Sequence, residues 1–281
     1  MKRKHTLLTT LLLAAGLTVG AQTNVMKLDF EKSNQVIDKN IYGQFAEHLG
    51  RCIYDGIWVG PDSDIPNVNG YRKDVLEALK ALKVPVLRWP GGCFADTYQW
   101  KHGVGPVNER PKIENIWWGG TVEDNSFGTH EFLNLCEILG ADAYVSINVG
   151  SATVYDMIEW IEYMTFDSDV EMANWRRRNG REEPWDIKFV GIGNESWGCG
   201  GDMTPEHYAD LLRQYSIFAK MYGKEKFQRV GCGANSFDLN WTDVVMNKAW
   251  RHMDALSVHY YTIATGNFDD KRSATNFGED L

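Results

Sequence analysis

The chain has 281 residues, of which 43% are hydrophobic, enough for one sizeable core and within the range of a single α/β barrel. Charged residues make up 24% of the chain and form no block of like charge, which argues against intrinsic disorder. The formal net charge of -9 argues against a nucleic-acid binder, since such proteins usually present a basic face.

The N-terminal residues have the composition of a secretory signal peptide. Basic residues at positions 2–4 precede a short apolar run over residues 7–17, and Ala21 ends a group of small residues. The run is too short to span a membrane, and no other stretch approaches about 18 apolar residues. We therefore predict a signal peptide over residues 1–21, no membrane span, and export to the periplasm or the outside of the cell.

Export would place the cysteines in an oxidising compartment. Their count is odd and their spacing shows no pairs, so a disulfide framework is not implied. The chain has no CxxC and no Cys/His cluster with zinc spacing, so we expect no metal site. The five cysteines are Cys52, Cys93, Cys136, Cys199 and Cys232.

Short β-rich runs and longer helical patterns alternate along the rest of the chain. An N-terminal strand segment is predicted over residues 22–40. The third helical pattern has Thr204 as N-cap, Pro205 at the first helical position and Gly223 at its end. In chain order we expect strands at 41–45, 84–89, 143–148, 187–193, 228–232 and 255–260, and helices at 71–83, 129–139 and 204–222.

This alternation predicts parallel βα units, which both a doubly wound sheet and a (β/α)8 barrel would contain. Polar residues at the carboxyl ends of most strands favour the barrel, because barrel enzymes build their active sites at that face. They are Glu47, Arg88, Asn148, Asn194, Glu195, Asn235 and His259. Six strands are found where a closed barrel has eight, and residues 269–281 are polar without a strand pattern. We therefore expect residues 41–281 to form an incomplete (β/α)8 barrel.

The strongest local signal is a buried strand that ends in Asn194 and Glu195, among aromatic residues. Desolvation there would raise the pKa of the Glu195 carboxyl and allow it to donate a proton near neutral pH. A carboxylate that merely caps the next helix is the structural alternative. The preceding Gly-Ile-Gly resembles a dinucleotide-binding loop, but the third glycine is misplaced at Gly198, which argues against a Rossmann-type oxidoreductase.

Three further segments follow predicted strands. Residues 88–94, RWPGGCF, predict a tight turn with an exposed backbone, although an ordinary βα loop has the same composition. Glu47, His48 and Arg51 follow the first strand of the predicted barrel. Alternation places His259 and Tyr261 on one face, which is either the functional interior of a barrel or simple core filling.

Four segments in this order, AEHLGR, RWPGGCFAD-x-YxW, GIGNESWGCGG and SVHYY, closely resemble the α-L-arabinofuranosidases of glycoside hydrolase family 51. The resemblance implies a (β/α)8 barrel followed by a C-terminal β-sandwich. It also implies a retaining, exo-acting enzyme that removes terminal arabinofuranosyl groups from arabinan, arabinoxylan and similar plant polymers. The resemblance implies a homo-oligomer. It implies neither a cofactor nor a nucleic-acid partner.

The resemblance also assigns residues. It makes Glu195 the catalytic acid/base and leaves the nucleophile, a Glu at the end of the seventh strand, without a match in this chain. Glu279 lies in a polar tail and is not assigned. The substrate-binding residues that it implies are Glu47, Cys93, Asn194, Trp197, His259 and Tyr261.

Two other functions remain open. A different barrel glycosidase, such as an endo-xylanase or endo-glucanase, would also end a strand in Asn-Glu. A non-catalytic sugar-binding protein would fit a barrel that lacks its nucleophile.

Overall fold

The computed structural model describes residues 36–220 and 226–260. Contacts divide the chain between Asp38 and Lys39, and every described helix and strand belongs to the second unit. The predicted signal peptide and residues 22–35 of the predicted strand segment lie outside the described residues. The rest of that segment is not a strand, because residues 36–38 have no regular structure and a 3-10 helix begins at Lys39.

The helices and strands follow one another in βα order. Their bounds are η1 Lys39–Tyr42, β1 Gln44–Phe45, β2 Asn67–Val68, β3 Tyr71–Arg72, α2 Lys73–Leu82, β4 Val86–Trp89, η2 Cys93–Thr97, η3 Trp100–Gly103, η4 Val107–Glu109, β5 Ile113–Asn115, β6 Thr121–Glu123, α3 Thr129–Leu139, β7 Asp142–Ile147, α4 Val154–Thr165, α5 Glu171–Arg178, β8 Ile187–Ile192, α6 Pro205–Phe218, β9 Gln228–Gly231, α7 Leu239–Ala249, η5 Trp250–His252 and β10 Ala255–Leu256. None of the helices in this described part is long and apolar enough to cross a membrane.

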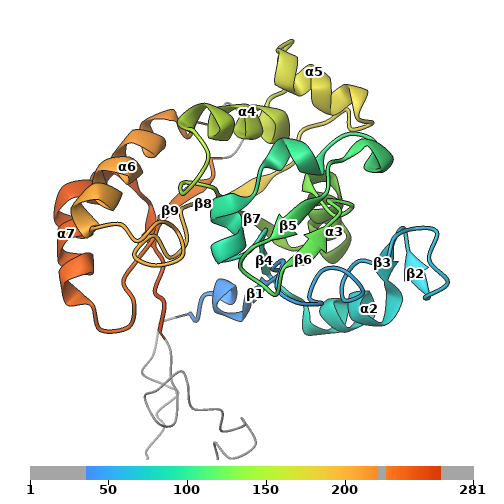
Figure 1. Ribbon diagram of the computed structural model, residues 1–281, viewed down its shortest axis with the longest axis horizontal. Helices are drawn as coiled ribbons and strands as arrows, with labels where there is room; N and C mark the ends of the chain where they lie inside the picture. Colours follow the sequence, from blue (N-terminus) through green and yellow to red (C-terminus); the bar gives the residue numbers. More distant parts are fainter. Residues whose placement is uncertain (1–35, 221–225, 261–281) are drawn as a thin grey trace, which may run out of the picture. The chain divides into compact units, whose positions relative to one another are not determined.

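Six of the strands form one sheet in the order β1-β4-β7-β8-β9-β10, and every neighbouring pair is parallel (Figure 1). The order never reverses along the chain. A doubly wound sheet has a reversal at its switch point, whereas a barrel is wound in one direction only. The sheet therefore confirms the predicted incomplete barrel and excludes the doubly wound alternative.

Buried apolar strands hold this sheet together. All four residues of β4 are buried, and the Trp89 ring stacks on Phe132 of α3 with 5.1 Å between ring centroids. Val145 and Ile147 of β7 and Val190 of β8 are buried in the same core. Burial of each such side chain stabilises the fold by about 1.5–3 kcal/mol, so the strand ends that carry polar residues are held on a rigid base.

Local sequence explains where the predicted helices begin. Residues 129–139 form α3 as predicted, and Gly128 precedes it because any side chain there would overlap the carbonyl oxygen of Gly103. The Glu131 carboxylate accepts a hydrogen bond from the Gly128 amide at 2.8 Å. Thr204 caps α6 by accepting from the His207 amide, with Pro205 at the first helical position as expected.

Several predicted bounds were wrong. The first strand is reduced to Gln44–Phe45, because the residues before Gly43 form η1. The helix predicted from residue 71 begins at Lys73, since Tyr71 and Arg72 pair with β2 as strand β3. Helix α6 ends at Phe218 because Ala219 leaves the helical conformation, with a ψ of 81°; Tyr222 and Gly223 lie outside the described residues.

Two hairpins interrupt the βα pattern and were not predicted. Strands β2 and β3 form one between β1 and α2, and β5 and β6 form the other between β4 and α3. Both are antiparallel and only two or three residues long per strand. They enlarge the loops that follow β1 and β4, and these loops carry several of the site residues described next.

Candidate active site

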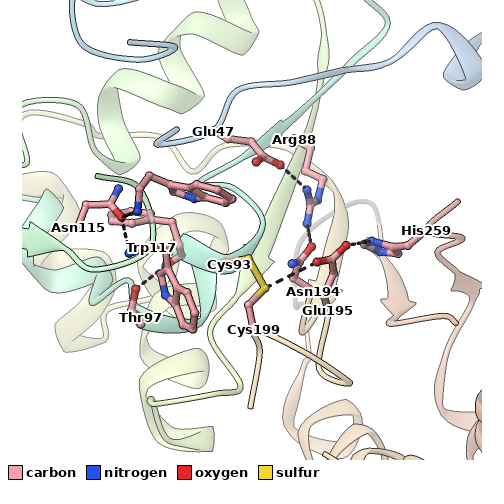
Figure 2. The surroundings of a disulfide bond; sticks show 12 residues. Glu47, Arg88, Cys93, Thr97, Asn115, Trp117, Asn194, Glu195, Cys199 and His259 are labelled. Carbon is pink, nitrogen blue, oxygen red and sulfur yellow. Dashed lines mark hydrogen bonds and ion pairs between the residues drawn. A yellow bond between two sulfur atoms is a disulfide. The ribbon is translucent and has the colours of Figure 1, made fainter. Parts of the chain in front are cut away.

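Side chains from four separate segments meet where the parallel strands end (Figure 2). Glu47 follows β1, Arg88 lies in β4, and Asn194 and Glu195 follow β8. His259 follows β10 and is joined to Asn235 by an isolated parallel bridge. Because the carboxyl ends of parallel strands lie on one edge of a sheet, the polar residues that the sequence analysis singled out are brought together.

The buried Arg88 guanidinium fixes two of these side chains. Its Nη1 donates to Glu47 Oε1 at 3.1 Å, and its Nη2 donates to Asn194 Oδ1 at 2.6 Å. The cation also lies over the rings of Phe45 and Tyr144, 5.1 Å and 5.7 Å from their centroids. The planar fork of arginine can serve both acceptors at once, so Glu47 and Asn194 are held in one fixed relation.

Gly92 keeps the space between those two side chains open. A Cβ at this position would lie 3.3 Å from Asn194 Nδ2 and 3.5 Å from Glu47 Oε2. The Pro-Gly-Gly turn that follows β4 thus brings bare backbone beside a carboxylate and an amide, as the sequence analysis expected of this segment. Such a position suits a polar ligand that hydrogen-bonds to both groups.

Both oxygens of the Glu195 carboxyl have close neighbours. His259 Nδ1 lies 3.0 Å from Oε1, and the Cys199 sulfur lies 3.7 Å from Oε2. His259 is in turn 3.2 Å from Ser257 Oγ through Nε2. The Glu195 side chain is 14% exposed, so it is shielded from bulk solvent while remaining accessible. A partly desolvated carboxyl with a fixed orientation is suited to proton transfer.

Trp197 lies beside this pair. Its ring is nearly perpendicular to that of His259, with centroids 6.1 Å apart, and its Nε1 donates to the Gly233 carbonyl at 3.0 Å. Tyr261, the last predicted site residue, lies outside the described residues. The structure therefore places Glu47, Asn194, Glu195, Trp197 and His259 at the carboxyl ends of the parallel strands, and their roles as site residues stay a prediction.

Cys93 is also at the site, but as half of a disulfide with Cys199. The prediction that no disulfide is implied was therefore wrong. The two cysteines are 106 residues apart in sequence, and their Cα atoms are 5.3 Å apart because the loops after β4 and β8 lie side by side. Spacing in the sequence cannot reveal a pairing that the sheet creates. The other three cysteines, Cys52, Cys136 and Cys232, are free.

Asp96 lies beneath the loops of the site and is 2% exposed. Its Oδ1 accepts hydrogen bonds from the amides of Val149 and Gly150, both at 3.0 Å. Burial raises the pKa of the Asp96 carboxyl to about 7, although these hydrogen bonds and the charge of Arg88 act in the opposite direction. This residue was not singled out by the sequence, where it is an ordinary aspartate in a βα loop.

His48 and Arg51, which follow Glu47 in the AEHLGR segment, make contacts outside the site. The buried His48 accepts from Trp89 Nε1 at 3.1 Å through Nε2, so its proton lies on Nδ1, which donates to Glu123 Oε2 at 2.8 Å. Arg51 is 80% exposed and pairs with Asp55. The His48 side chain thus anchors the β5–β6 hairpin and does not reach the site, and the motif contributes Glu47 alone.

Three contributors to the site have no individual assignment from the sequence. Arg88 is predicted only as a polar strand end, and Gly92 and Cys199 are not assigned. The signals were present, since Arg88 precedes the Pro-Gly-Gly turn and Cys199 lies in the GCGG run directly after Glu195. What the sequence could not show was which of these residues touch.

A singly wound parallel sheet whose carboxyl ends carry a shielded carboxyl and its polar partners is the arrangement of a barrel-type enzyme domain. Residues 78–273 match the sequence profile of the alpha-L-arabinofuranosidase 1 domain. The chain therefore belongs to the α-L-arabinofuranosidases of glycoside hydrolase family 51, as the four motifs predicted.

Individual relatives agree. The chain is 56% identical to the intracellular exo-alpha-L-arabinofuranosidase of Bacteroides ovatus, over 98% of this chain and 53% of that protein. It is 48% identical to alpha-L-arabinofuranosidase C of Emericella nidulans, over 66% of this chain and 37% of that protein. The crystal structure of the arabinofuranosidase of family 51 from Xanthomonas axonopodis pv. citri superimposes with a TM-score of 0.85 and 47% identity, covering 87% of this chain and 50% of that one. The chain thus spans about half the length of such relatives.

The prediction of export is contradicted by this comparison. The Bacteroides ovatus relative is named intracellular, and its match covers 98% of this chain, so most of the apolar N-terminal run lies within the matched region. The prediction rested on charge and hydropathy over about 20 residues, a pattern too short to separate a cleaved leader from another N-terminal segment.

Proposed function

We propose that the protein is a retaining, exo-acting α-L-arabinofuranosidase that removes terminal arabinofuranosyl groups from arabinose-containing plant polysaccharides. Glu195 is its catalytic acid/base. The proposal concerns the whole protein, because this chain spans about half the length of its relatives. The observation that carries it is the Glu195 carboxyl, held between His259 and the Cys93–Cys199 pair at the carboxyl end of β8.

The geometry supports proton transfer in both halves of the reaction. In its acid form Glu195 donates a proton to the glycosidic oxygen as the bond to the leaving group breaks. As a carboxylate it then takes a proton from the water that releases the sugar from the enzyme. His259 fixes the position of the carboxyl throughout, since its Nδ1 lies 3.0 Å from Oε1 of Glu195. We assign no residue of this chain as the nucleophile.

The surrounding residues suit a small polyhydroxylated ring. Glu47 and Asn194 are held by Arg88 and offer an acceptor and an amide donor on the two sides of Gly92. We propose that they bind the arabinose hydroxyls, and that Trp197, His259 and Tyr261 complete the sugar contacts. Cys93 would contribute a van der Waals contact, because a disulfide sulfur carries no hydrogen to donate.

The test is hydrolysis by the full-length protein. We expect release of 4-nitrophenol from 4-nitrophenyl α-L-arabinofuranoside and of arabinose, without oligosaccharides, from arabinan. Glu195→Gln should lower turnover of arabinan by about 10²–10⁴-fold, the usual contribution of general acid–base catalysis. Glu206→Gln is the matched control, because Glu206 is an exposed glutamate in the first turn of α6.

Azide rescue distinguishes a catalytic role of Glu195 from a merely structural one. If Glu195 is the acid/base, azide should accelerate the Glu195→Gln variant on the nitrophenyl substrate, because azide attacks the sugar without needing a base. Near-normal turnover of arabinan by this variant would refute the assignment. Oligosaccharides from unbranched xylan would favour an endo-glycanase, and arabinose binding without turnover by the folded wild type would favour a binding protein.

A further inference from the structure

Three atoms that can bind a metal converge on the acid/base residue. The sulfurs of Cys93 and Cys199 and a carboxylate oxygen of Glu195 all lie within 4.8 Å of one another, and all three residues are half-buried. Zinc binds cysteine sulfur at about 2.3 Å and carboxylate oxygen at about 2.0–2.2 Å, so small rotations of the three side chains after reduction would bring all three atoms to one ion. In the oxidised chain the sulfurs bond to each other and are poor ligands.

We propose that reduction of the Cys93–Cys199 disulfide creates a binding site for a soft divalent cation such as Zn²⁺, formed by the two thiolates and the Glu195 carboxylate. The site is available only in the reduced protein, and its occupation withdraws Glu195 from proton transfer. The binding itself stands on the geometry of the three residues. Only its effect on catalysis rests on the proposed function.

The reduction step is a two-electron exchange with a small reductant. A dithiol transfers two electrons to the S–S bond, which breaks, and becomes a cyclic disulfide while its two protons pass to Cys93 and Cys199. With a phosphine, phosphorus is oxidised to the phosphine oxide, water supplies the oxygen, and the two protons of that water go to the sulfurs. Both cysteines are half-buried, so a small reductant can reach the bond.

The charges around the reduced pair favour a dication. Zinc binds the thiolate form, so the two protons that reduction placed on the sulfurs pass to the solvent on binding. The two thiolates and the Glu195 carboxylate then place three negative charges together, and the nearby Arg88 already serves Glu47 and Asn194. A bound dication relieves this repulsion, and thiolates select zinc over hard cations such as Mg²⁺. His259 contacts the second carboxylate oxygen at 3.0 Å and so orients the first toward the sulfurs, in the manner of the outer residues of zinc sites.

No sequence motif marks such a site, because zinc motifs are recognised by short spacings between ligands. Here the ligands come from the loops after β4 and β8, and Cys93 and Cys199 are 106 residues apart. Only Glu195 and Cys199 are close in sequence, and they flank the turn in which the Gly198 and Gly200 amides donate to the Glu195 carbonyl. That turn brings the second sulfur back beside the carboxylate.

The experiment measures Zn²⁺ binding by the full-length protein, in competition with a chromophoric chelator. Thiol titration under denaturing conditions defines the starting state, because reduction of the disulfide adds two titratable thiols to those already present. The protein is reduced with a phosphine, separated from it without oxygen, and compared with untreated protein. The Cys93→Ser/Cys199→Ser double variant tests the site, and Cys52→Ser, which removes a half-buried cysteine outside the disulfide, is the matched control.

We expect one additional Zn²⁺ per chain for reduced wild type and Cys52→Ser, and none for oxidised wild type or the double variant. Glu195→Gln should weaken binding by about tenfold or more, since even groups outside the ligand set contribute that much in zinc sites. Equal Zn²⁺ binding by reduced wild type and the reduced double variant would overturn the proposal. The comparison of oxidised and reduced wild type needs no substitution, so a variant that fails to fold does not remove the test.

The effect on catalysis is measured separately with the nitrophenyl arabinofuranoside. Zn²⁺ should inhibit the reduced protein reversibly, with recovery on addition of a chelator, and leave the oxidised protein unaffected. Inhibition of equal strength in both states would overturn the link between the disulfide and the site. Absence of hydrolysis in every state would contradict the proposed function, while the binding measurement would still decide the metal site.

Discussion

Two buried carboxyl groups lie in the loop between β4 and α3, and their surroundings shift their pKa values in opposite directions. Glu123, at the end of the β5–β6 hairpin, is 3% exposed, and Asp96 in η2 is 2% exposed. Burial raises the pKa of the Glu123 carboxyl, but hydrogen bonds from His48, Asn115 and Tyr54 outweigh it, and the pKa is lowered overall. Burial dominates for Asp96, whose pKa rises to about 7.

The difference teaches what a buried carboxyl needs. Glu123 accepts from the side chains of His48 and Asn115, at 2.8 Å each, and these donors replace the water that burial removes. Asp96 accepts two backbone amides on a single oxygen, which is too little to offset the burial that raises its pKa. The hairpin is therefore held by the Glu123 carboxylate, whereas the loops of the site pack on the Asp96 carboxyl, whose pKa lies near neutral pH.

The largest effect on stability should come from breaking the hairpin network. Glu123→Ala leaves the buried donors of His48 and Asn115 without acceptors, and we expect the free energy of unfolding to fall by about 2–4 kcal/mol. Because the folded pKa of Glu123 lies below its ordinary value of 4.5, the wild-type advantage is fully present above that pH and is lost as the pH falls. Urea unfolding at neutral and acidic pH measures both the loss of free energy of unfolding and its dependence on pH. Glu114→Ala, at an exposed position on the same hairpin, should change little.

Asp96 should give the opposite pH dependence. Its folded pKa is raised from 3.8 to about 7, so the folded state binds the proton more tightly and the stability from this group is lost as the pH rises between these values. Asp96→Asn removes the titration, and we expect its free energy of unfolding to gain on the order of 3–4 kcal/mol relative to wild type between about pH 4 and 8. A difference that stays constant with pH, like that of the exposed Asp62→Asn control, would contradict the assignment.

Arg88 extends the comparison to a third carboxyl, Glu47, which is paired with a cation. Arg88→Met should lower stability by about 1–3 kcal/mol, because it removes the donors to Glu47 and Asn194. Turnover should fall more steeply, by about 10²-fold, since both groups lose their fixed positions. Arg88→Lys should restore the charge but not the fork, and so recover stability better than turnover. Equal recovery of both would show that charge alone matters.

The smallest effect should come from the exposed pair of Arg51 and Asp55. Arg51 is 80% exposed, and surface ion pairs contribute about 0–1 kcal/mol. Arg51→Ala should therefore leave turnover unchanged and shift thermal unfolding only slightly. A large loss of turnover would mean that the first motif acts as a unit, contrary to the separate positions of Glu47, His48 and Arg51.

Much of the fold could be predicted because hydrophobic runs and caps are local signals. Helix α3 was predicted to the residue, and β4, β7, β8 and β9 within two residues of their bounds, whereas the strand predicted over residues 255–260 is only Ala255–Leu256. The hairpins were missed because strands of two or three residues carry too little pattern. The predicted bounds of the first strand were wrong at Gly43, where the chain passes so close to β4 that a side chain would overlap Val86.

The site was predictable as a set of strand ends but not as a network. The positions of Glu47, Asn194, Glu195 and His259 followed from alternation of strands and helices. Their pairings did not, because Arg88 and Asn194 are 106 residues apart, as are Cys93 and Cys199. Polar contacts over such separations depend on sheet order and on the angle of each loop, and neither is written in the local sequence.

The bond between Cys93 and Cys199 also closes a covalent ring that contains the hairpin β5–β6, the strands β7 and β8 and the helices between them. A protease cut anywhere inside this ring leaves two pieces that remain one molecule until they are reduced. Nicked protein should thus migrate as an intact chain on a non-reducing gel and as two fragments after reduction. The loop that carries Glu195 would stay attached to the end of β4 even when the backbone between them is broken.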